Sequence, residues 1–190
     1  MTEDIITGIQ RKLEKHLRPE RYRHTIGVMY TAASLSMCHK GNIEKAMLAG
    51  LLHDCGKEYS IKEQKRLCRE YKIPLTESEL KMPALIHAKL GTYLTEHEYN
   101  IEDSEVLNAI TYHTTGKPDM TLLEKIIYIA DYIEPGRIAI PVLDKVRYVA
   151  FSNIEEAVAL SAGSTISYLK KMGRDIDPMT IKTYEYYTKK

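Results

Sequence analysis

The residues of this chain that could do chemistry are four histidines and two aspartates, each on or at the end of a segment with helical periodicity: His24, His53, Asp54, His87, His113 and Asp131. Taken singly, each is explained as a core histidine bonded to a carbonyl or as an aspartate that caps a turn. Together they are unusual, because a buried imidazole or carboxylate is costly unless it is paired or bound to a metal. Six such residues on five expected helices therefore predict a metal site.

The adjacent pair His53 and Asp54 ends the apolar run 46–52. Neighbours on a helix point about 100° apart, so the two side chains cannot enter one site as a parallel pair from mid-helix. Near a helix C-terminus they can lie on either side of an ion, and the partial negative charge of the helix end favours a cation. With His24 and Asp131 they form a mixed nitrogen and oxygen shell, which suits Fe, Mn, Ni, Co or Zn better than Ca or Mg.

A second ion is also expected. His87 and His113 supply nitrogen donors for it, and the two oxygens of Asp54 could bridge the two ions. Paired metals about 3.5–4 Å apart can generate a bridging hydroxide and stabilise the attacking and leaving oxygens of phosphoryl transfer. The six residues thus predict a two-metal hydrolytic site with Asp54 at its centre.

Helices must position these side chains, because helical periodicity dominates the chain and alternating strand patterns are hard to find. Ile5, Ile9, Leu13 and Leu17 recur every fourth residue and predict one apolar stripe on a first helix. Pro19 is expected to open a second helix, which carries His24. No repeat, low-complexity tract or Gly/Ser linker divides the chain. The sequence therefore predicts a single all-α domain over residues 1–190.

Several helix boundaries are announced by capping residues. Asn42 is the expected N-cap of the helix that ends near Asp54, and Gly56 its expected stop. Capping boxes predict three helix starts, at Ser60-x-x-Glu63, Thr76-x-x-Glu79 and Thr121-x-x-Glu124. Further helices are expected from Pro83 through His87, over 102–112, after Pro141, over 153–172 and from Thr180.

The overall charge gives no long-range attraction to a polyanion. With 27 basic and 26 acidic side chains the net charge is +1, so neither nucleic acid nor a membrane surface is an expected partner. Residues 1–4 carry acid where a secretory signal carries base, and the run 46–52 is too short to span a bilayer, so we expect a cytoplasmic protein. Cys38, Cys55 and Cys68 form no Cys-x-x-Cys pair and are expected to act as small hydrophobes.

The ordered set of ligands resembles the six-ligand pattern of dinuclear HD-domain phosphohydrolases. The segments RYRHTIGV, LLHDCGKE, YHTTG and ADYIEPGR look like the bacterial YqeK branch, and the resemblance covers about residues 18–170. An HD dipeptide alone arises often by chance, but the ordered set with HTTG and DYIEPGR is strongly specific. The resemblance implies an HD-type helical bundle that hydrolyses diadenosine tetraphosphate symmetrically to two ADP, with a di-iron centre.

Local cations must attract such a substrate, since the net charge is almost zero. Lys57 follows Asp54 by three residues and could reach a phosphate; the resemblance places it in the active-site motif, and the alternative is a solvated lysine. Arg137 could clamp a phosphate bidentately, or else pair with Glu134. Phosphate contacts are also expected from the segment after His113, unless it is a plain helix exit: Thr114, Thr115, Gly116 and Lys117.

Two other functions remain open at this stage. An HD-type nucleotidase or nucleoside triphosphate phosphohydrolase would use the same metals, although mononuclear versions do without His87 and His113. A non-catalytic nucleotide and metal sensor is the other alternative. The Tyr-rich end, with Tyr184, Tyr186 and Tyr187, could pack on the core or on a second copy, so a homodimer is open as well.

Overall fold

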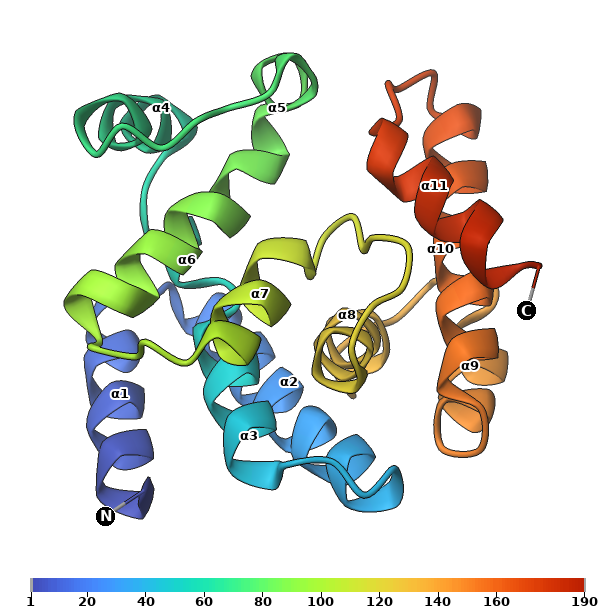
Figure 1. Ribbon diagram of the computed structural model, residues 1–190, viewed down its shortest axis with the longest axis horizontal. Helices are drawn as coiled ribbons and strands as arrows, with labels where there is room; N and C mark the ends of the chain where they lie inside the picture. Colours follow the sequence, from blue (N-terminus) through green and yellow to red (C-terminus); the bar gives the residue numbers. More distant parts are fainter. Residues whose placement is uncertain (1, 190) are drawn as a thin grey trace.

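The computed structural model describes residues 2–189, and all regular structure in that range is helical (Figure 1). The all-α fold predicted from the sequence is confirmed. In chain order the elements, with η for a 3₁₀ helix, are α1 (Thr2–His16), α2 (Pro19–Cys38), α3 (Ile43–Leu52), η1 (Cys55–Glu58), α4 (Ile61–Glu70), α5 (Glu77–Lys81), η2 (Pro83–Leu85), α6 (Ile86–Glu98), α7 (Ser104–Tyr112), α8 (Leu122–Ile133), α9 (Leu143–Ala150), α10 (Ile154–Lys171) and α11 (Pro178–Tyr187).

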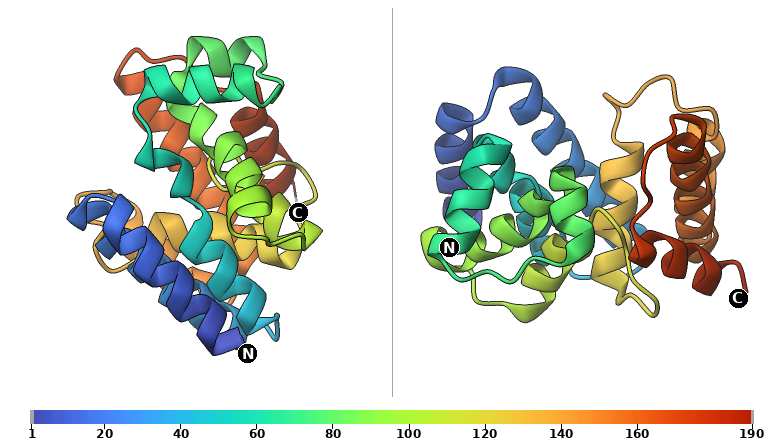
Figure 2. Two further views of the ribbon diagram at one scale, coloured as in Figure 1. Left: turned by 90° about the vertical axis from the view of Figure 1, so that its left-hand side faces the viewer. Right: turned by 90° about the horizontal axis from the view of Figure 1, so that it is seen from above.

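Helix α8 forms the centre of the molecule. It packs against α2, α3 and α7 on one side and against α9 and α10 on the other, and Figure 1 shows it end-on between them. Its residues Ile126, Ile127 and Ile129 are fully buried, as expected for a helix that is apolar around most of its surface. The pair α10 and α11 forms a separate layer beside α8, which Figure 2 shows from above.

Two glycines let the elements that carry the histidines approach closely. A Cβ on Gly50 of α3 would lie 2.9 Å from the Met29 Cα of α2, so this glycine allows the two helix backbones to pack together. A Cβ on Gly56 of η1 would lie 2.4 Å from the His87 carbonyl oxygen of α6. No side chain fits in either place, and the ends of α3 and α6 are therefore held next to each other.

The capping signals are confirmed. The Asn42 side chain accepts a hydrogen bond from the Lys45 N–H at the start of α3. Each of the three predicted capping boxes forms, with both reciprocal hydrogen bonds, at the start of α4, α5 and α8. Asn153 likewise caps α10.

Other details of the prediction are wrong. Ile5 is 45% exposed and Ile6 takes its place in the core, because a strict spacing of four drifts around a helix of 3.6 residues per turn. Gly56 is not a helix stop: α3 ends at Leu52 and Gly56 lies inside η1. Pro83 begins the 3₁₀ turn η2, and α6 itself begins at Ile86.

The cysteines divide into two kinds. Cys55 and Cys68 are buried as small hydrophobes, and burial raises the pKa of the Cys55 thiol to about 12. Cys38 is exposed, contrary to the prediction, and its thiol contacts the Phe151 carbonyl oxygen.

Over residues 2–189, no helix combines the length and the apolar character needed to cross a bilayer.

Candidate metal centre

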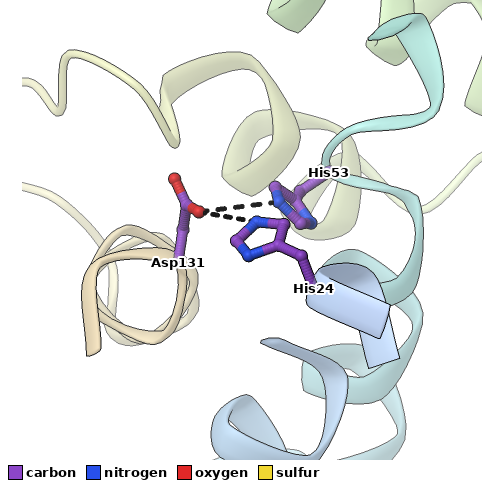
Figure 3. A group of neighbouring side chains, drawn as sticks. All are labelled: His24, His53 and Asp131. Atoms are coloured by element: carbon purple, nitrogen blue, oxygen red, sulfur yellow. Dashed lines mark ion pairs between the residues drawn. The ribbon is translucent and has the colours of Figure 1, made fainter. Parts of the chain in front are cut away.

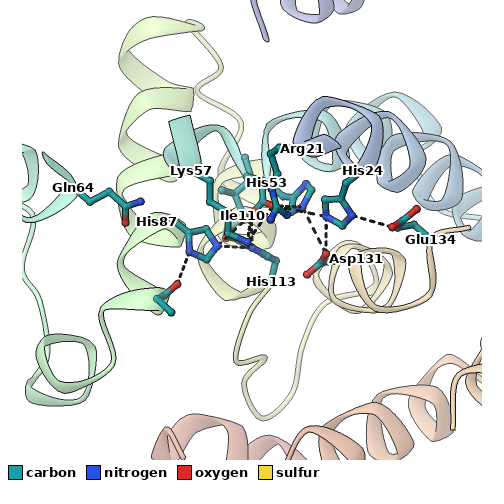
Figure 4. A network of polar contacts seen from close by, with 12 residues as sticks. Arg21, His24, His53, Lys57, Gln64, His87, Ile110, His113, Asp131 and Glu134 are labelled. Carbon is teal, nitrogen blue, oxygen red and sulfur yellow. Dashed lines mark hydrogen bonds and ion pairs between the residues drawn. The ribbon is translucent and has the colours of Figure 1, made fainter. Parts of the chain in front are cut away.

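The six predicted side chains come together in one buried cluster. His24 lies on α2, His87 on α6 and Asp131 on α8, while His53 and His113 follow directly on α3 and α7 (Figure 4). All four histidines are at least nine-tenths buried, and Asp54 is 1% exposed. The structure thus brings together residues that are up to 107 positions apart in the sequence, from 24 to 131.

Asp54 lies between two pairs of histidines. Its Oδ2 atom is 3.4 Å from His53 Nε2 and 3.7 Å from His24 Nε2. Its Oδ1 atom is 3.3 Å from His87 Nε2 and 3.6 Å from His113 Nε2. One carboxylate therefore faces a separate group of nitrogen donors with each of its oxygens.

Asp131 completes the first of these groups. Its Oδ1 atom lies 3.0 Å from His24 Nε2 and 3.8 Å from His53 Nε2. Figure 3 draws these three side chains with dashed lines for the two ion pairs. In the second group the two Nε2 atoms of His87 and His113 are 3.1 Å apart. All of these short distances involve the same ring nitrogen, Nε2, of each histidine.

Hydrogen bonds at the other ring nitrogen fix the tautomer. The Nδ1 atoms of His53, His87 and His113 each lie 2.7 Å from a carbonyl oxygen three residues earlier in the chain. A carbonyl can only accept, so Nδ1 carries the proton and Nε2 presents a lone pair. His53 and His113 cap the C-termini of α3 and α7, where carbonyl groups of the last turn lack helical partners.

The converging lone pairs are the observation that fits a metal. The Nε2 atoms of His24 and His53 are buried without a hydrogen-bond partner. A buried acceptor without a partner is costly, and two facing lone pairs repel each other unless a cation lies between them. Two sets of ligand atoms lie within 4.8 Å of one another and could each hold an ion: His24, His53 and Asp131, and His53, Asp54 and His113.

The protonation states also suit metal ligands. Burial lowers the pKa of His53, and it lowers the pKa of His87 to about 4. Burial alone would raise the pKa of Asp54, but the facing His53 and His113 hold it well below its ordinary value. Burial alone would likewise raise the pKa of Asp131, but the facing His24 and His53 and the Arg137 guanidinium hold it well below its ordinary value. At neutral pH His53 and His87 are therefore neutral imidazoles and Asp54 and Asp131 are ionised carboxylates, as metal binding requires.

Cationic side chains line the more open side of the cluster. Lys57 Nζ lies 3.0 Å from Asp54 Oδ1, and Arg137 Nη2 lies 2.5 Å from Asp131 Oδ1. Their side chains are 30% and 36% exposed. The alternative pairing of Arg137 with Glu134 is therefore wrong, because the Arg137 guanidinium holds both the carboxylate and the backbone carbonyl of Asp131.

Sequence reasoning missed two further members of the cluster. Arg21 Nη1 lies 2.8 Å from Asp54 Oδ2, and Glu134 Oε1 lies 3.0 Å from His24 Nδ1. Spacing could have found both, since Arg21 stands three residues before His24 and Glu134 three residues after Asp131, on the same helix faces. Glu134 is buried, and its second oxygen accepts the Gly136 N–H at 2.6 Å.

The segment after His113 is held by other contacts. Gly116 has a left-handed φ of +63° and packs against Thr183 of α11, whose hydroxyl donates to the Thr115 carbonyl at 3.0 Å. Lys117 Nζ lies 3.0 Å from Glu124 Oε1, a capping-box carboxylate that is only 1% exposed. The structure brings Lys117 to Glu124 rather than to the histidines, because a buried carboxylate needs a counter-charge.

Comparisons with known proteins agree with this geometry. The family model described as HD domain matches residues 21–136, a range that contains all six candidate ligands. The chain belongs to the HD-domain family. This HD-domain chain is 38% identical over 184 residues to a symmetrical bis(5′-nucleosyl)-tetraphosphatase of Bacillus subtilis strain 168, covering 97% of this chain and 96% of that protein.

Two further similar proteins cover nearly the same length. A protein of the same name from Halalkalibacterium halodurans is 42% identical over 172 residues, which is 90% of this chain and 91% of that protein. A crystal structure from Clostridium acetobutylicum, described as a predicted HD superfamily hydrolase involved in NAD metabolism, has a TM-score of 0.92 at 37% identity, with 96% of each chain covered. The resemblance to this branch of the HD-domain family is confirmed.

Proposed function

We propose that this HD-domain protein hydrolyses diadenosine tetraphosphate symmetrically to two ADP at the cluster around Asp54. The observation that carries the proposal is the convergence of four histidine lone pairs on one carboxylate. Its sequence similarity to symmetrical bis(5′-nucleosyl)-tetraphosphatases along almost its full length supports the choice of substrate. We also infer that residues 1–190 act as one domain and that the protein is cytoplasmic.

Two divalent ions are the proposed cofactor. His24, His53, Asp54 and Asp131 would hold one ion, and Asp54, His87 and His113 the other, with Asp54 shared between them. Iron is the proposed native metal, and Mn, Ni, Co or Zn are chemically acceptable to the same nitrogen and oxygen donors. When bound, such a pair supplies a nucleophilic water at neutral pH and offsets negative charge at the phosphorus.

The cations of the cluster are proposed to hold the phosphate chain. Lys57, Arg21 and Arg137 contact the two carboxylates and remain between 29% and 36% exposed, so they can also be reached by a ligand from solvent. A planar guanidinium matches phosphate oxygens bidentately, and the lysine acts as a point charge. Positioning by these groups, rather than proton donation, is what an ADP leaving group of low pKa requires.

The second pair of histidines favours this activity over that of a mononuclear HD-type nucleotidase or triphosphohydrolase. Such an enzyme needs only His24, His53, Asp54 and Asp131. His87 and His113 would then bind no metal, and their buried, facing lone pairs would lower the stability of the folded protein. A sensor without turnover would not require Lys57 and Arg137 at the opening of the cluster.

Product analysis tests the proposal. The protein is purified without chelator, supplied with ferrous iron or manganese under reducing conditions, and incubated with diadenosine tetraphosphate in ¹⁸O-water. We expect ADP as the sole product, with one ¹⁸O-labelled ADP per cleavage, and no turnover by the His53→Ala variant. AMP with ATP as products, or no turnover by wild-type protein that retains metal, would contradict the proposal.

A further inference from the structure

The guanidinium group of Arg147 on α9 binds three backbone carbonyl groups around the end of α8. Its Nε atom donates to the Ile133 carbonyl oxygen, and its Nη2 atom donates to those of Glu134 and Arg137, each at 3.0 Å. Asp144 on the same helix lies 3.9 Å from Arg147 Nη1 and is fully exposed, so this ion pair contributes little. The hydrogen bonds of Arg147 therefore hold backbone rather than a carboxylate.

The turn that Arg147 binds has few backbone donors with which to fix itself. Pro135 has no N–H, and the Gly136 N–H donates to the Glu134 side chain. The Arg137 N–H donates to the Glu134 carbonyl oxygen at 2.9 Å and closes the turn. The carbonyl groups at a helix C-terminus lack helical partners, and a positive charge is favourable beside them. Arg147 thus ties the end of α8 and the turn after it to α9.

Each end of this turn contacts one candidate metal ligand. At the first end, Glu134 Oε1 lies 3.0 Å from His24 Nδ1, a contact that Figure 4 draws as a dashed line. At the other end, the Arg137 guanidinium donates to both the carboxylate and the carbonyl oxygen of Asp131. His24 and Asp131 are ligands of the same proposed ion. The position of the turn therefore bears on one of the two proposed metal sites.

The Glu134 carboxylate has little room to move. A Cβ on Gly27 of α2 would lie 2.7 Å from its Oε2 atom, and a Cβ on Gly136 would lie 3.0 Å from each of its oxygens. Glycine at both positions lets the carboxylate fit between α2 and the turn. Because the carboxylate is packed against the turn itself, a displacement of the turn changes the contact of Glu134 with His24.

We propose that Arg147 is a positioning residue for the metal site that contains His24 and Asp131. The inference rests on the proposed function. Arg147 acts by fixing both ends of the turn, and this action needs the planar fork of a guanidinium, which directs donors to three carbonyl groups at once. The compact ammonium of a lysine has the same charge but not this geometry.

Equilibrium metal titration of the metal-free protein tests the inference without any substrate. Arg147→Met keeps the aliphatic stem and removes the donors, and we expect the site with His24 to lose about ten-fold in metal affinity while the other site is unchanged. Arg147→Lys should also weaken this one site, because the ammonium does not replace the fork. Lys125→Met is the matched control: it breaks the ion pair with Glu155 near the other end of α8 and should change neither affinity.

Two further measurements separate positioning from a general loss of stability. Since Arg147 is proposed to act on His24 through Glu134, the double variant of Arg147→Met and Glu134→Gln should bind metal at this site about as tightly as Glu134→Gln alone. Guanidinium ion at millimolar concentration should restore metal affinity to Arg147→Ala but not to Glu134→Gln. The Arg147 side chain is 33% exposed and lines a pocket of about 600 Å³, so the ion can reach the vacated position.

Several results would overturn the inference. They are wild-type affinity at both sites in Arg147→Met or Arg147→Lys, equal weakening of both sites, full additivity in the double variant, and no rescue of Arg147→Ala by guanidinium. Arg147→Lys retains the charge, so it carries the same test if Arg147→Met does not fold. Diadenosine tetraphosphate hydrolysis by the wild-type protein is measured in parallel, and a failure of the proposed function is seen separately as absence of ADP formation.

Discussion

Replacing Glu134 by glutamine should weaken one of the two proposed metal sites and spare the other. Glu134 Oε1 lies 3.0 Å from His24 Nδ1, and its Oε2 accepts the Gly136 N–H at 2.6 Å. Glutamine has nearly the same shape but only one acceptor oxygen, so its amide N–H₂ must face either the imidazole N–H or the backbone N–H. The substitution therefore removes the carboxylate that fixes the His24 tautomer and raises the basicity of its Nε2 atom.

The expected loss of metal affinity can be judged from other metal sites in which a carboxylate accepts a hydrogen bond from a metal-bound histidine. Loss of a carboxylate behind a metal-bound histidine typically costs about 10- to 100-fold in metal affinity, or about 1.4–2.7 kcal/mol. Only the metal site that contains His24 should lose affinity, because His87 and His113 are oriented by the backbone carbonyls of Ala84 and Ile110.

Equilibrium metal titration of the metal-free protein measures both sites. Wild-type protein should bind two equivalents, and Glu134→Gln should bind one equivalent as before and the second with lower affinity. Glu70→Gln is the control, since Glu70 is exposed on α4 and pairs with Arg66 rather than with any residue of the cluster. Equal weakening of both equivalents, or wild-type affinity for both, would refute the role given to Glu134.

Three further outcomes are expected. The urea concentration at the unfolding midpoint of the metal-free protein should decrease as the pH falls from about 6.5 to 4. Burial lowers the pKa of His87 to about 4 in the folded state, whereas the same imidazole takes up a proton near pH 6.5 in the unfolded state. A midpoint that does not change with pH would contradict this. Gly56→Ala should lower the free energy of unfolding by about 2–3 kcal/mol, because the new methyl group clashes with the His87 carbonyl oxygen. Gly8→Ala has open space around its methyl group and should raise the free energy of unfolding by about 0.5–1 kcal/mol. Equal unfolding midpoints of the two variants would show the clash argument to be wrong. Lys57→Met should lower kcat/KM for diadenosine tetraphosphate about 100-fold, because it removes a cation of the proposed phosphate site. Lys62→Met, at an exposed position of α4, should leave kcat/KM unchanged. Similar steady-state kinetics of the two variants would remove Lys57 from the proposed site.

Much of the cluster was predictable because its signals are local. His24, His53, Asp54, His87, His113 and Asp131 were identified by residue type and by their places on apolar helices, without knowledge of how the helices pack. The capping boxes are equally local, since each of their reciprocal hydrogen bonds spans three residues. Such patterns are complete within one turn of chain and need no tertiary information.

The contacts that could not be predicted from the sequence depend on packing between segments that are far apart in the chain. His24 and Glu134 are 110 residues apart, and their hydrogen bond exists only because α2 packs against α8. Lys117 directly follows the HTTG segment and is a candidate phosphate ligand by sequence, yet its side chain pairs with the buried Glu124 at the start of α8.

The most direct test of the account is ADP formation measured as a function of metal bound per chain. Metal-free protein is loaded stepwise with manganese or ferrous iron under reducing conditions, and the metal content and the rate of diadenosine tetraphosphate cleavage are determined on the same samples. The account predicts that symmetrical cleavage rises with the second equivalent and reaches its maximum at two. Full activity at one equivalent, or no ADP formation with both equivalents bound, would contradict the two-metal centre around Asp54.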